Sequence, residues 1–520
     1  MDNVTEFWNS VGATNADAEY LADLILERST PIAVSDLVNH LIDWRLQAQL
    51  KSQAEVDARR AQRYQPRGVY RVGDQLYFPA LEGRAGVVKK IRAGDNPRYG
   101  EFQVIAVQLD GETKAREFAA GFAHAHALNQ DHAAQNISAL TDVQARAQYG
   151  EGVRKNLARR LNADKEFICV GDQYFLKGLL TKIPEGYLNI AEAAIEQAND
   201  ALPTTELVKV LELPPNVKKT GVTFSLAVAL AQDARFEDVG RPGAVRWFLT
   251  RLEPPEVRER PALLEMPNDR VVPLAPELET IAADLFLETD LNNREDTAAS
   301  TRQELTLVLT YPHRRAGTLP MVPSVRAFLP AFINARLKIS FVDAATQERF
   351  AGFAVAEGNY VAGLSAWYAA RHLQPGALVT LRKHVEPLSL TIEYQPQRER
   401  SLWMRVAKAQ NGELTFAQEK RPLAHRCDDE MLIMIGDAAG IDSAAEHLRQ
   451  SHASLDKLLQ SVFPELAKLS GAGRVHAKTL YSAVNFVRRA GLRAVMTALA
   501  ESRAFTPVGG GYFGLNEAQR

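Results

Sequence analysis

The chain has 520 residues, of which 46% are hydrophobic and 24% charged, so it is expected to form roughly three to five folded domains and not a wholly disordered polymer. Its 61 Lys and Arg nearly balance its 63 Asp and Glu, and the formal net charge of −2 argues against a polybasic protein that coats nucleic acid. Two cysteines, Cys169 and Cys427, are too few for a disulfide framework, so a reducing compartment is expected. The N-terminus is acidic and no long uncharged apolar run occurs, so we expect a cytoplasmic protein with no membrane partner.

Within the first 122 residues, the spacing of apolar residues changes once, from a helical period to a period of two. Over 1–65 the spacing is helical, with Leu21, Leu24 and Ile25 on one face and Ser35 placed to cap a second helix, which predicts an N-terminal helical region that a winged helix would also fit. Over 66–122 the period is two, and turn residues separate short strands, which predicts a small β-barrel. Its segment GRAGVV at 83–88, followed by a basic strand, resembles an SH3-like or KOW-type barrel.

A short motif occurs three times. Phe-x-x-Val-Gly begins at Phe167, Phe236 and Phe505, and each copy follows an apolar helical stretch and precedes a turn and an aromatic pair. This layout predicts a helix that leads into a β-hairpin wing. We therefore assign three winged-helix modules, at 123–185, 186–262 and 427–520.

The second copy lies in the most complete module. Residues 187–252 begin YLNIAEAAIEQANDALPTTELVKVL and end TFSLAVALAQDARFEDVGRPGAVRWFL. This stretch resembles the HARE-HTH winged helix, a fold shared with the delta subunit of bacterial RNA polymerase. The resemblance implies a first helix, a turn into a second helix capped by Thr204 or Thr205, a third helix and a wing.

Charge is segregated around an acidic linker at 263–303. Residues 306–426 hold 16 Lys and Arg and 8 Asp and Glu, a formal +8, which leaves −10 for the rest of the chain. The 304–426 region is rich in strand patterns and carries one helix pattern, LSAWYAARH at 364–372, before a Leu-x-Pro-Gly turn. This order resembles the DNA-binding pseudobarrel of plant auxin-response-type transcription factors and of some restriction-enzyme effector domains, although Ala377 stands where that family has Asp. The expected fold class is thus multi-domain α+β, with several winged-helix modules, a small SH3-like barrel and a larger basic pseudobarrel.

Basic residues at particular positions suggest where DNA would bind. In module 1 the apolar stripe Val153, Leu157 and Leu161 turns the opposite helix face outward, and guanidinium and ammonium groups on such a face suit phosphate and guanine contacts. A loop expected at 311–318 has adjacent guanidinium groups that could enter a groove. The DNA-binding candidates are Arg154, Lys155, Asn156, Arg159 and Arg160 in module 1, Lys218 and Lys219 in module 2, His313, Arg314, Arg315, Arg382 and Lys383 in the basic region, and Lys478, Arg488, Arg489 and Arg493 in module 3.

No phosphate loop, dinucleotide fingerprint, nucleophile elbow or zinc motif occurs in the sequence. The expected function is that of a non-enzymatic, bacterial-type DNA-binding protein without cofactors, with double-stranded DNA as partner, in transcription regulation or another DNA transaction and nucleoid-associated. One alternative is a protein-interaction scaffold, such as an RNA-polymerase-associated factor. A second is a metal-dependent nuclease or restriction-type effector, for which carboxylates gather at 277–290 and 428–430 without a recognisable metal-binding pattern.

Overall fold

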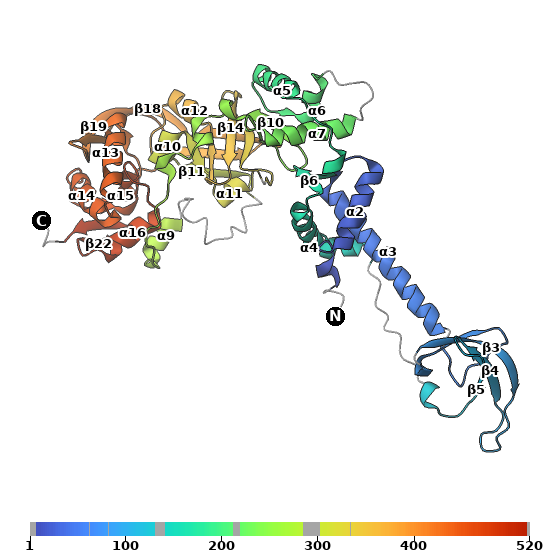
Figure 1. Cartoon of the computed structure of the whole chain (residues 1–520). Coiled ribbons are helices and arrows are strands. Elements are labelled where there is room, and N and C mark those ends of the chain that lie inside the picture. The colour runs from blue at the N-terminus through green and yellow to red at the C-terminus, as the bar shows by residue number, and fades with distance from the viewer. Residues whose placement is uncertain are drawn as a thin grey trace. The chain divides into compact units, whose positions relative to one another are not determined.

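The computed structural model describes residues 7–61, 63–81, 83–129, 141–211, 219–283, 302–332 and 334–516, with only the backbone described at 52–61 and 219. The fold is mixed α+β with several sheets, as the sequence predicts (Figure 1). The chain forms two compact units, Met1–Cys169 with Gln173–Leu179, and Val170–Asp172 with Leu180–Arg520. Within the described ranges, no helix combines the length and apolar character needed to cross a bilayer.

The first unit contains a helical module whose parts are distant in sequence. Its helices are α2 (Asn15–Arg28), α3 (Val34–Ala61) and α4 (Asp142–Ala163), and its sheet has the order β1-β7-β6, with β1 at Ile32–Ala33, β6 at Phe167–Val170 and β7 at Gln173–Leu176. The pairing of Ile32 with Tyr174 joins the region at 1–65 to the module at 123–185, whereas the sequence analysis assigns them to separate domains. Strand β1 is only two residues long, too short to show an apolar period.

Between α3 and α4 the chain forms a four-stranded antiparallel sheet. Its strands, in the order β2-β3-β4-β5, are β2 (Gln75–Phe78), β3 (Arg84–Ala93), β4 (Gln103–Leu109) and β5 (Arg116–Ala120). Their alternation of buried and exposed residues follows the period of two in the sequence. Phe78, Val88, Ile105 and Val107 form its core.

The second unit begins with α5 (Glu185–Ala198), β8 (Leu202–Pro203), α6 (Thr204–Lys209), α7 (Lys219–Gln232), β9 (Phe236–Asp238) and β10 (Arg246–Leu249), with the sheet order β8-β10-β9. The expected cap of the second helix is wrong, because the N-cap residue is Pro203, which makes no side-chain cap hydrogen bond. The Thr204 hydroxyl instead accepts a hydrogen bond of 2.8 Å from Trp247 Nε1. Thr204 therefore ties α6 to the hairpin.

The next part is a curled seven-stranded sheet with the order β11-β16-β17-β13-β14-β15-β12. Its strands are β11 (Glu304–Val308), β12 (Thr318–Pro320), β13 (Arg336–Asp343), β14 (Arg349–Val355), β15 (Tyr360–Ala362), β16 (Leu378–Lys383) and β17 (Ser389–Tyr394). Strands β13 and β17 run parallel and the other pairs antiparallel. The helices of this region are α8 (Pro255–Arg258), α9 (Pro276–Ala283), α10 (Tyr311–Ala316), α11 (Pro323–Arg326) and α12 (Ser365–Ala370).

Strand β13 also holds the β9–β10 hairpin. Lys338 N donates to Val239 O at 2.9 Å, and Lys338 Nζ lies 2.6 Å from Asp200 Oδ1 and 4.2 Å from the centre of the Phe248 ring. Arg336 forms an ion pair of 2.7 Å with Glu237. Hairpin and sheet are thus packed as neighbours within the second unit.

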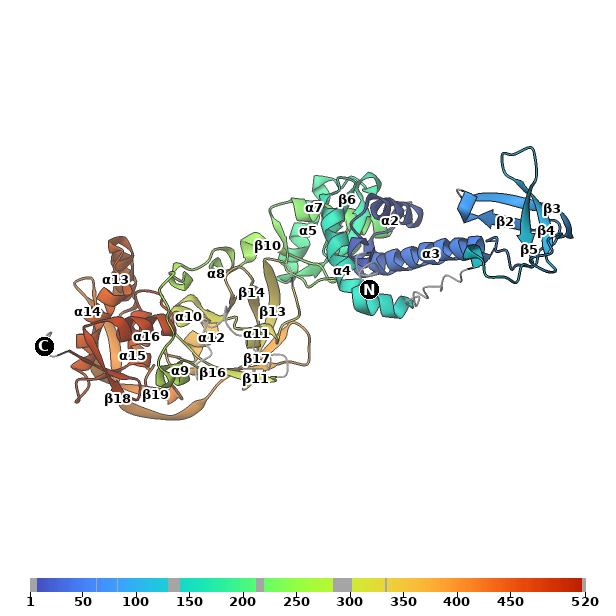
Figure 2. The same cartoon turned by 90° about the horizontal axis from the view of Figure 1, so that it is seen from below.

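The C-terminal part combines a long hairpin with a helical core. Strands β18 (Pro396–Gln410) and β19 (Glu413–His425) form the hairpin and pack against α13 (Ala438–Ser451) and α14 (Leu455–Ala467), as Figure 2 shows from below. Strand β20 (Met434–Ile435) pairs with β18. Helices α15 (Ala477–Val484) and α16 (Leu492–Glu501) precede β22 (Phe505–Gly509) and β23 (Tyr512–Leu515), and β21 (Val475–His476) completes a sheet with the order β21-β23-β22.

The three predicted hairpins are confirmed. Each copy of the motif forms two adjacent strands that follow a helix, namely β6 and β7 after α4, β9 and β10 after α7, and β22 and β23 after α16. The motif phenylalanines Phe167, Phe236 and Phe505 are buried. Each hairpin is joined by a two-residue strand that precedes a helix, which gives three sheets of the same order.

Candidate nucleic-acid interface

Helix α4 presents a basic face to solvent. Thr141 and Gln144 form a capping box that starts the helix, and Val153, Leu157 and Leu161 are buried as the sequence predicts. Arg154, Lys155 and Arg159 therefore point outward and are exposed. Glu151 is the described acid nearest to two of them, with 3.9 Å between charged atoms to Arg154 and to Lys155, a pairing that contributes little in water.

The two other candidates on α4 are structural. Asn156 Nδ2 donates to Asn9 O at 2.8 Å, and Arg160 donates to Asp164 Oδ2 at 2.9 Å and to Asn15 Oδ1 at 3.1 Å. Asp164 has a lowered pKa, because the Glu166 amide and Arg160 outweigh its desolvation. Asn156 and Arg160 hold the helix in place, so the exposed basic face of α4 consists of Arg154, Lys155 and Arg159.

In the second module, Lys218 lies outside the described residues. Lys219 begins α7, and its side chain is likewise outside them. Further along α7, Leu226, Ala227 and Leu230 are buried in the core formed with the β9–β10 hairpin. The described part of α7 therefore presents no basic face.

The expected loop at 311–318 is wrong, because Tyr311–Ala316 form helix α10, which ends at Gly317 in the left-handed region. His313 is buried, with Nδ1 2.8 Å from Thr318 Oγ1. Arg314 Nε donates to Leu373 O at 2.6 Å, and burial lowers the pKa of its guanidinium. Tyr311 stacks on Phe486 at 4.1 Å between ring centres. Tyr311 thus packs against the C-terminal helical region, and His313 and Arg314 bond within the sheet region, so the segment is not an exposed loop.

The remaining candidates of the sheet region differ in their partners. Arg315 forms an ion pair of 2.6 Å with Asp442, and Arg382 pairs with Glu304 at 3.0 Å and with Glu393 at 2.7 Å. Arg315 donates a hydrogen bond to Asp442 and Arg382 donates one to Glu304, and these bonds raise the pKa values of both guanidinium groups. Lys383 is exposed at the end of β16. Of these, Lys383 alone has no ion pair with a described residue.

The four C-terminal candidates make internal contacts. Lys478 lies 3.0 Å from Asp428, Arg488 lies 2.7 Å from Asp269 and Arg493 lies 2.6 Å from Glu279. Arg489 is buried, and its Nη1 donates to Asn485 Oδ1 at 3.0 Å. Because these groups have acceptors inside the second unit, they stabilise its core.

The β18–β19 hairpin carries exposed basic residues that are not among the DNA-binding candidates given above, although Arg398 and Arg400 stand out in the sequence as cations that flank a strand. Arg398 and Arg400 are exposed along β18, Trp403 is 68% exposed, and Lys420 lies directly opposite Trp403 on β19. Arg398, Arg400 and Lys420 have no ion pair with a described residue. The signal in the sequence was the pair of cations Arg398 and Arg400 shortly before Trp403, in a strand whose burial could not be predicted from periodicity.

Several residues that could serve in catalysis or metal binding are either buried and neutral or held in ion pairs. Burial raises the pKa of Cys427 to about 12 and lowers that of His425, so the thiol and the ring are both neutral near pH 7. Glu279 and Asp428 of the acidic clusters are in the ion pairs given above. Among the residues that the structure describes, no group of three or more His, Cys, Asp or Glu could hold a metal ion.

Comparison with known proteins places this chain in no family. No family model, no curated protein and no solved structure matches it.

Proposed function

We propose that this protein binds double-stranded DNA without catalysis and serves in transcription or another DNA transaction. The observation that carries the proposal is the outward face of α4, where Arg154, Lys155 and Arg159 are exposed beside a helix stripe that is fully buried. Cations held on a rigid helix can neutralise phosphates and release their counterions, which is the main source of affinity for duplex DNA.

Topology supports the placement. We propose that the three units of helix and hairpin are winged helices, the one at 186–262 of the HARE-HTH type, since each has a short strand paired with a hairpin that follows a helix. Winged helices commonly read the major groove with the helix before the wing. Of the corresponding helices α4, α7 and α16, α4 is the one with an exposed basic face in the described residues, so α4 is the proposed groove helix.

For the two sheet regions we keep the proposed folds, and in the 304–426 region we move the proposed DNA contact to other residues. We retain the four-stranded sheet as SH3-like and the seven-stranded sheet as a pseudobarrel, since the latter curls and mixes parallel with antiparallel pairs. Its expected contact loop is buried as α10. We therefore assign the DNA contact of the second unit to the β18–β19 hairpin, with Arg398, Arg400 and Lys420.

A salt titration of the full chain on duplex DNA tests the proposal. Affinity should fall steeply with salt, because each released phosphate counterion contributes about 0.9 to the slope of log affinity against log salt. Binding that is absent at low salt, or a slope near zero, would exclude DNA as the partner.

Charge reversal locates the contact. The pair Arg154→Glu and Arg159→Glu should weaken duplex binding and lower the salt slope by about 2. The matched control reverses Arg449 and Lys457, exposed residues of α13 and α14, and changes the net charge equally. If both variants bind equally well, α4 does not contact DNA.

A second candidate function is that of a protein-interaction scaffold. The β9–β10 hairpin favours it, because this hairpin already contacts protein, through Lys338 and Phe248, where a DNA-binding wing would contact phosphate. Under this candidate the full chain binds no duplex at low salt and instead associates with another protein, such as RNA polymerase.

A further inference from the structure

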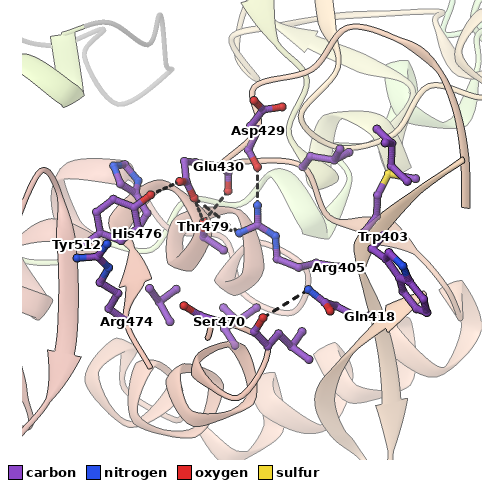
Figure 3. Close-up of a pocket in the computed structure, with 16 residues that line it drawn as sticks. Trp403, Arg405, Gln418, Asp429, Glu430, Ser470, Arg474, His476, Thr479 and Tyr512 are labelled. Carbon is purple, nitrogen blue, oxygen red and sulfur yellow. Dashed lines mark hydrogen bonds and ion pairs between the residues drawn. The ribbon is translucent and has the colours of Figure 1, made fainter. Parts of the chain in front are cut away.

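A cavity of about 390 Å³ opens beside the β18–β19 hairpin. Its walls come from β18 and β19, from the segment after β19, and from α14, α15, β21 and β23. Figure 3 shows Trp403 on one side of it, Arg474 and Tyr512 on the other, and Arg405 between them. Its volume is in the lower part of the range of small-molecule pockets, roughly 300–1,000 Å³.

The floor of the cavity is a fixed polar network. Arg405 Nη1 donates to Thr479 Oγ1 at 2.9 Å, and its Nη2 donates to Asp429 O. Glu430 accepts from Thr479 at 2.8 Å and from Tyr512 at 2.5 Å. Burial of Glu430 alone would raise its pKa, but the two hydroxyl groups, His476 and Arg405 lower it overall. The carboxylate is thus satisfied by protein donors, so the floor needs no bound cation.

The rim carries the groups that remain available. Trp403 exposes a ring face, and the Arg474 guanidinium lies over the Tyr512 ring at 5.1 Å from its centre. Arg474 is exposed, and like Lys420 it has no ion pair with a described residue. An exposed aromatic ring and the Arg474 cation at one cavity, with Lys420 paired to Trp403 on the neighbouring strand, match a ligand that combines a flat ring with an anion.

We infer that this cavity receives an unpaired nucleotide, with its base stacked on Trp403 and its phosphate near Arg474. Every base has a π-face, and stacking on an exposed aromatic ring with a cationic groove beside it is the usual basis of single-strand binding. A paired base cannot reach the ring, because both of its faces are stacked inside the duplex.

The inference rests on the proposed function, because it takes nucleic acid as the ligand. It differs from it in substrate and in the deciding residues: duplex binding is assigned to α4 and to the exposed cations of the β18–β19 hairpin, and the unpaired nucleotide to Trp403 and Arg474 at the cavity. The two can therefore fail separately. Loss of duplex binding in the α4 variant with single-strand binding intact supports both, whereas a wild-type chain that binds no duplex overturns only the proposed function.

The experiment measures binding of a 12-residue oligodeoxythymidylate, of its duplex with oligodeoxyadenylate, and of thymidine monophosphate to the full chain. Trp403→Ala should weaken oligodeoxythymidylate binding about tenfold, and Trp403→Phe should restore most of it, because a ring is kept. Val385→Ala, at a residue 97% exposed in the same unit, is the matched surface control and should have no effect. Arg474→Gln should lower the salt slope for the single strand by about 0.7.

Competition separates the sources of the nucleotide. Displacement by the monophosphate assigns the cavity to a free nucleotide, and displacement only by the oligonucleotide assigns it to a strand; both agree with the inference. Unchanged single-strand affinity in Trp403→Ala overturns it. So does equal competition by polyglutamate, which would show that the rim binds acidic peptides through charge alone.

Discussion

Glu253 is a carboxylate that the fold buries almost completely, with 2% of its surface exposed. Neither of its oxygens accepts a hydrogen bond from a described side chain or backbone group, and Arg336 Nε lies 3.6 Å away. Burial raises the pKa of Glu253 to about 7, and repulsion from Glu237 adds to this against the attraction of Arg336. The folded chain therefore holds this proton more tightly than the unfolded chain does.

This difference gives stability a pH dependence of known sign. As pH rises from about 4.5 to about 7, the unfolded chain loses this proton first, so the contribution of Glu253 to the free energy of unfolding falls, by on the order of 1–3 kcal/mol. Glu253→Gln removes the effect, so its Tm at about pH 8 should exceed that of the wild type and should vary less with pH. Glu259→Gln, at an exposed position nearby, should leave the Tm profile unchanged. An identical pH profile for Glu253→Gln and the wild type would contradict the argument.

At the scale of elements, the sequence predicted the hairpins, whose motif repeats, and the helix and strand faces that a regular spacing of apolar residues marks. The three hairpins could be predicted because the Phe-x-x-Val-Gly motif recurs and an aromatic pair follows each copy. The outward face of α4 could be predicted because Val153, Leu157 and Leu161 mark its buried stripe. Helix α10 could not be predicted. It has six residues, too few to show a helical period, and its burial depends on Phe486, far along the chain.

The same limit applied to most of the predicted contact residues. The sequence does not show whether a basic side chain is solvated or paired with a carboxylate. Arg488, for example, forms its ion pair with Asp269 only after folding. Two-residue strands such as β1 were missed for a related reason, since their place in the sheet is set by the partner strand. The cavity beside Trp403 joins segments that only the tertiary fold brings together.

The turn before β16 depends on a glycine for two reasons. Gly376 has φ of +97°, and a Cβ there would lie 2.8 Å from the backbone of Leu432. Gly412, in the turn of the β18–β19 hairpin, has φ of +79° with open space around it. Gly376→Ala should therefore lower the free energy of unfolding by more than Gly412→Ala, for which the backbone strain alone costs about 1 kcal/mol. Chemical denaturation of both variants measures the difference, and equal losses would show that the close approach to Leu432 relaxes freely.

At the scale of the whole molecule, the formal net charge of −2 includes two kinds of cationic side chain, those held in ion pairs and those exposed to solvent. Many guanidinium groups of the second unit are held in ion pairs, as Arg336 and Arg382 are. Arg154 and Arg159 on α4, and Arg398 and Arg400 on the β18–β19 hairpin, are instead exposed to solvent. A neutral sum is thus compatible with local positive surfaces. It limits nonspecific attraction and leaves binding to particular faces.

The contacts of Lys338 predict that the module at 186–262 and the seven-stranded sheet unfold together. Lys338→Ala removes the ion pair with Asp200 and the cation from the Phe248 ring. Amide hydrogen exchange in α5 and α6 should then become faster, because the module loses part of its support. Lys383→Ala, at an exposed position of the same sheet, should leave these amides unchanged. Equal exchange in the wild type and Lys338→Ala would show that the module is stable by itself.

The pairing of β1 with β7 sets the order in which parts of the first unit can fold during synthesis. Ile32 leaves the ribosome 142 residues before its partner Tyr174, which at translation speeds of about 5–20 residues per second is a delay of roughly 7–28 s. The four-stranded sheet has all its strands within 75–120, so it can be complete while the module that flanks it in sequence still lacks a sheet partner. The nascent chain therefore finishes its inserted part before the part that encloses it, the reverse of simple N-to-C folding.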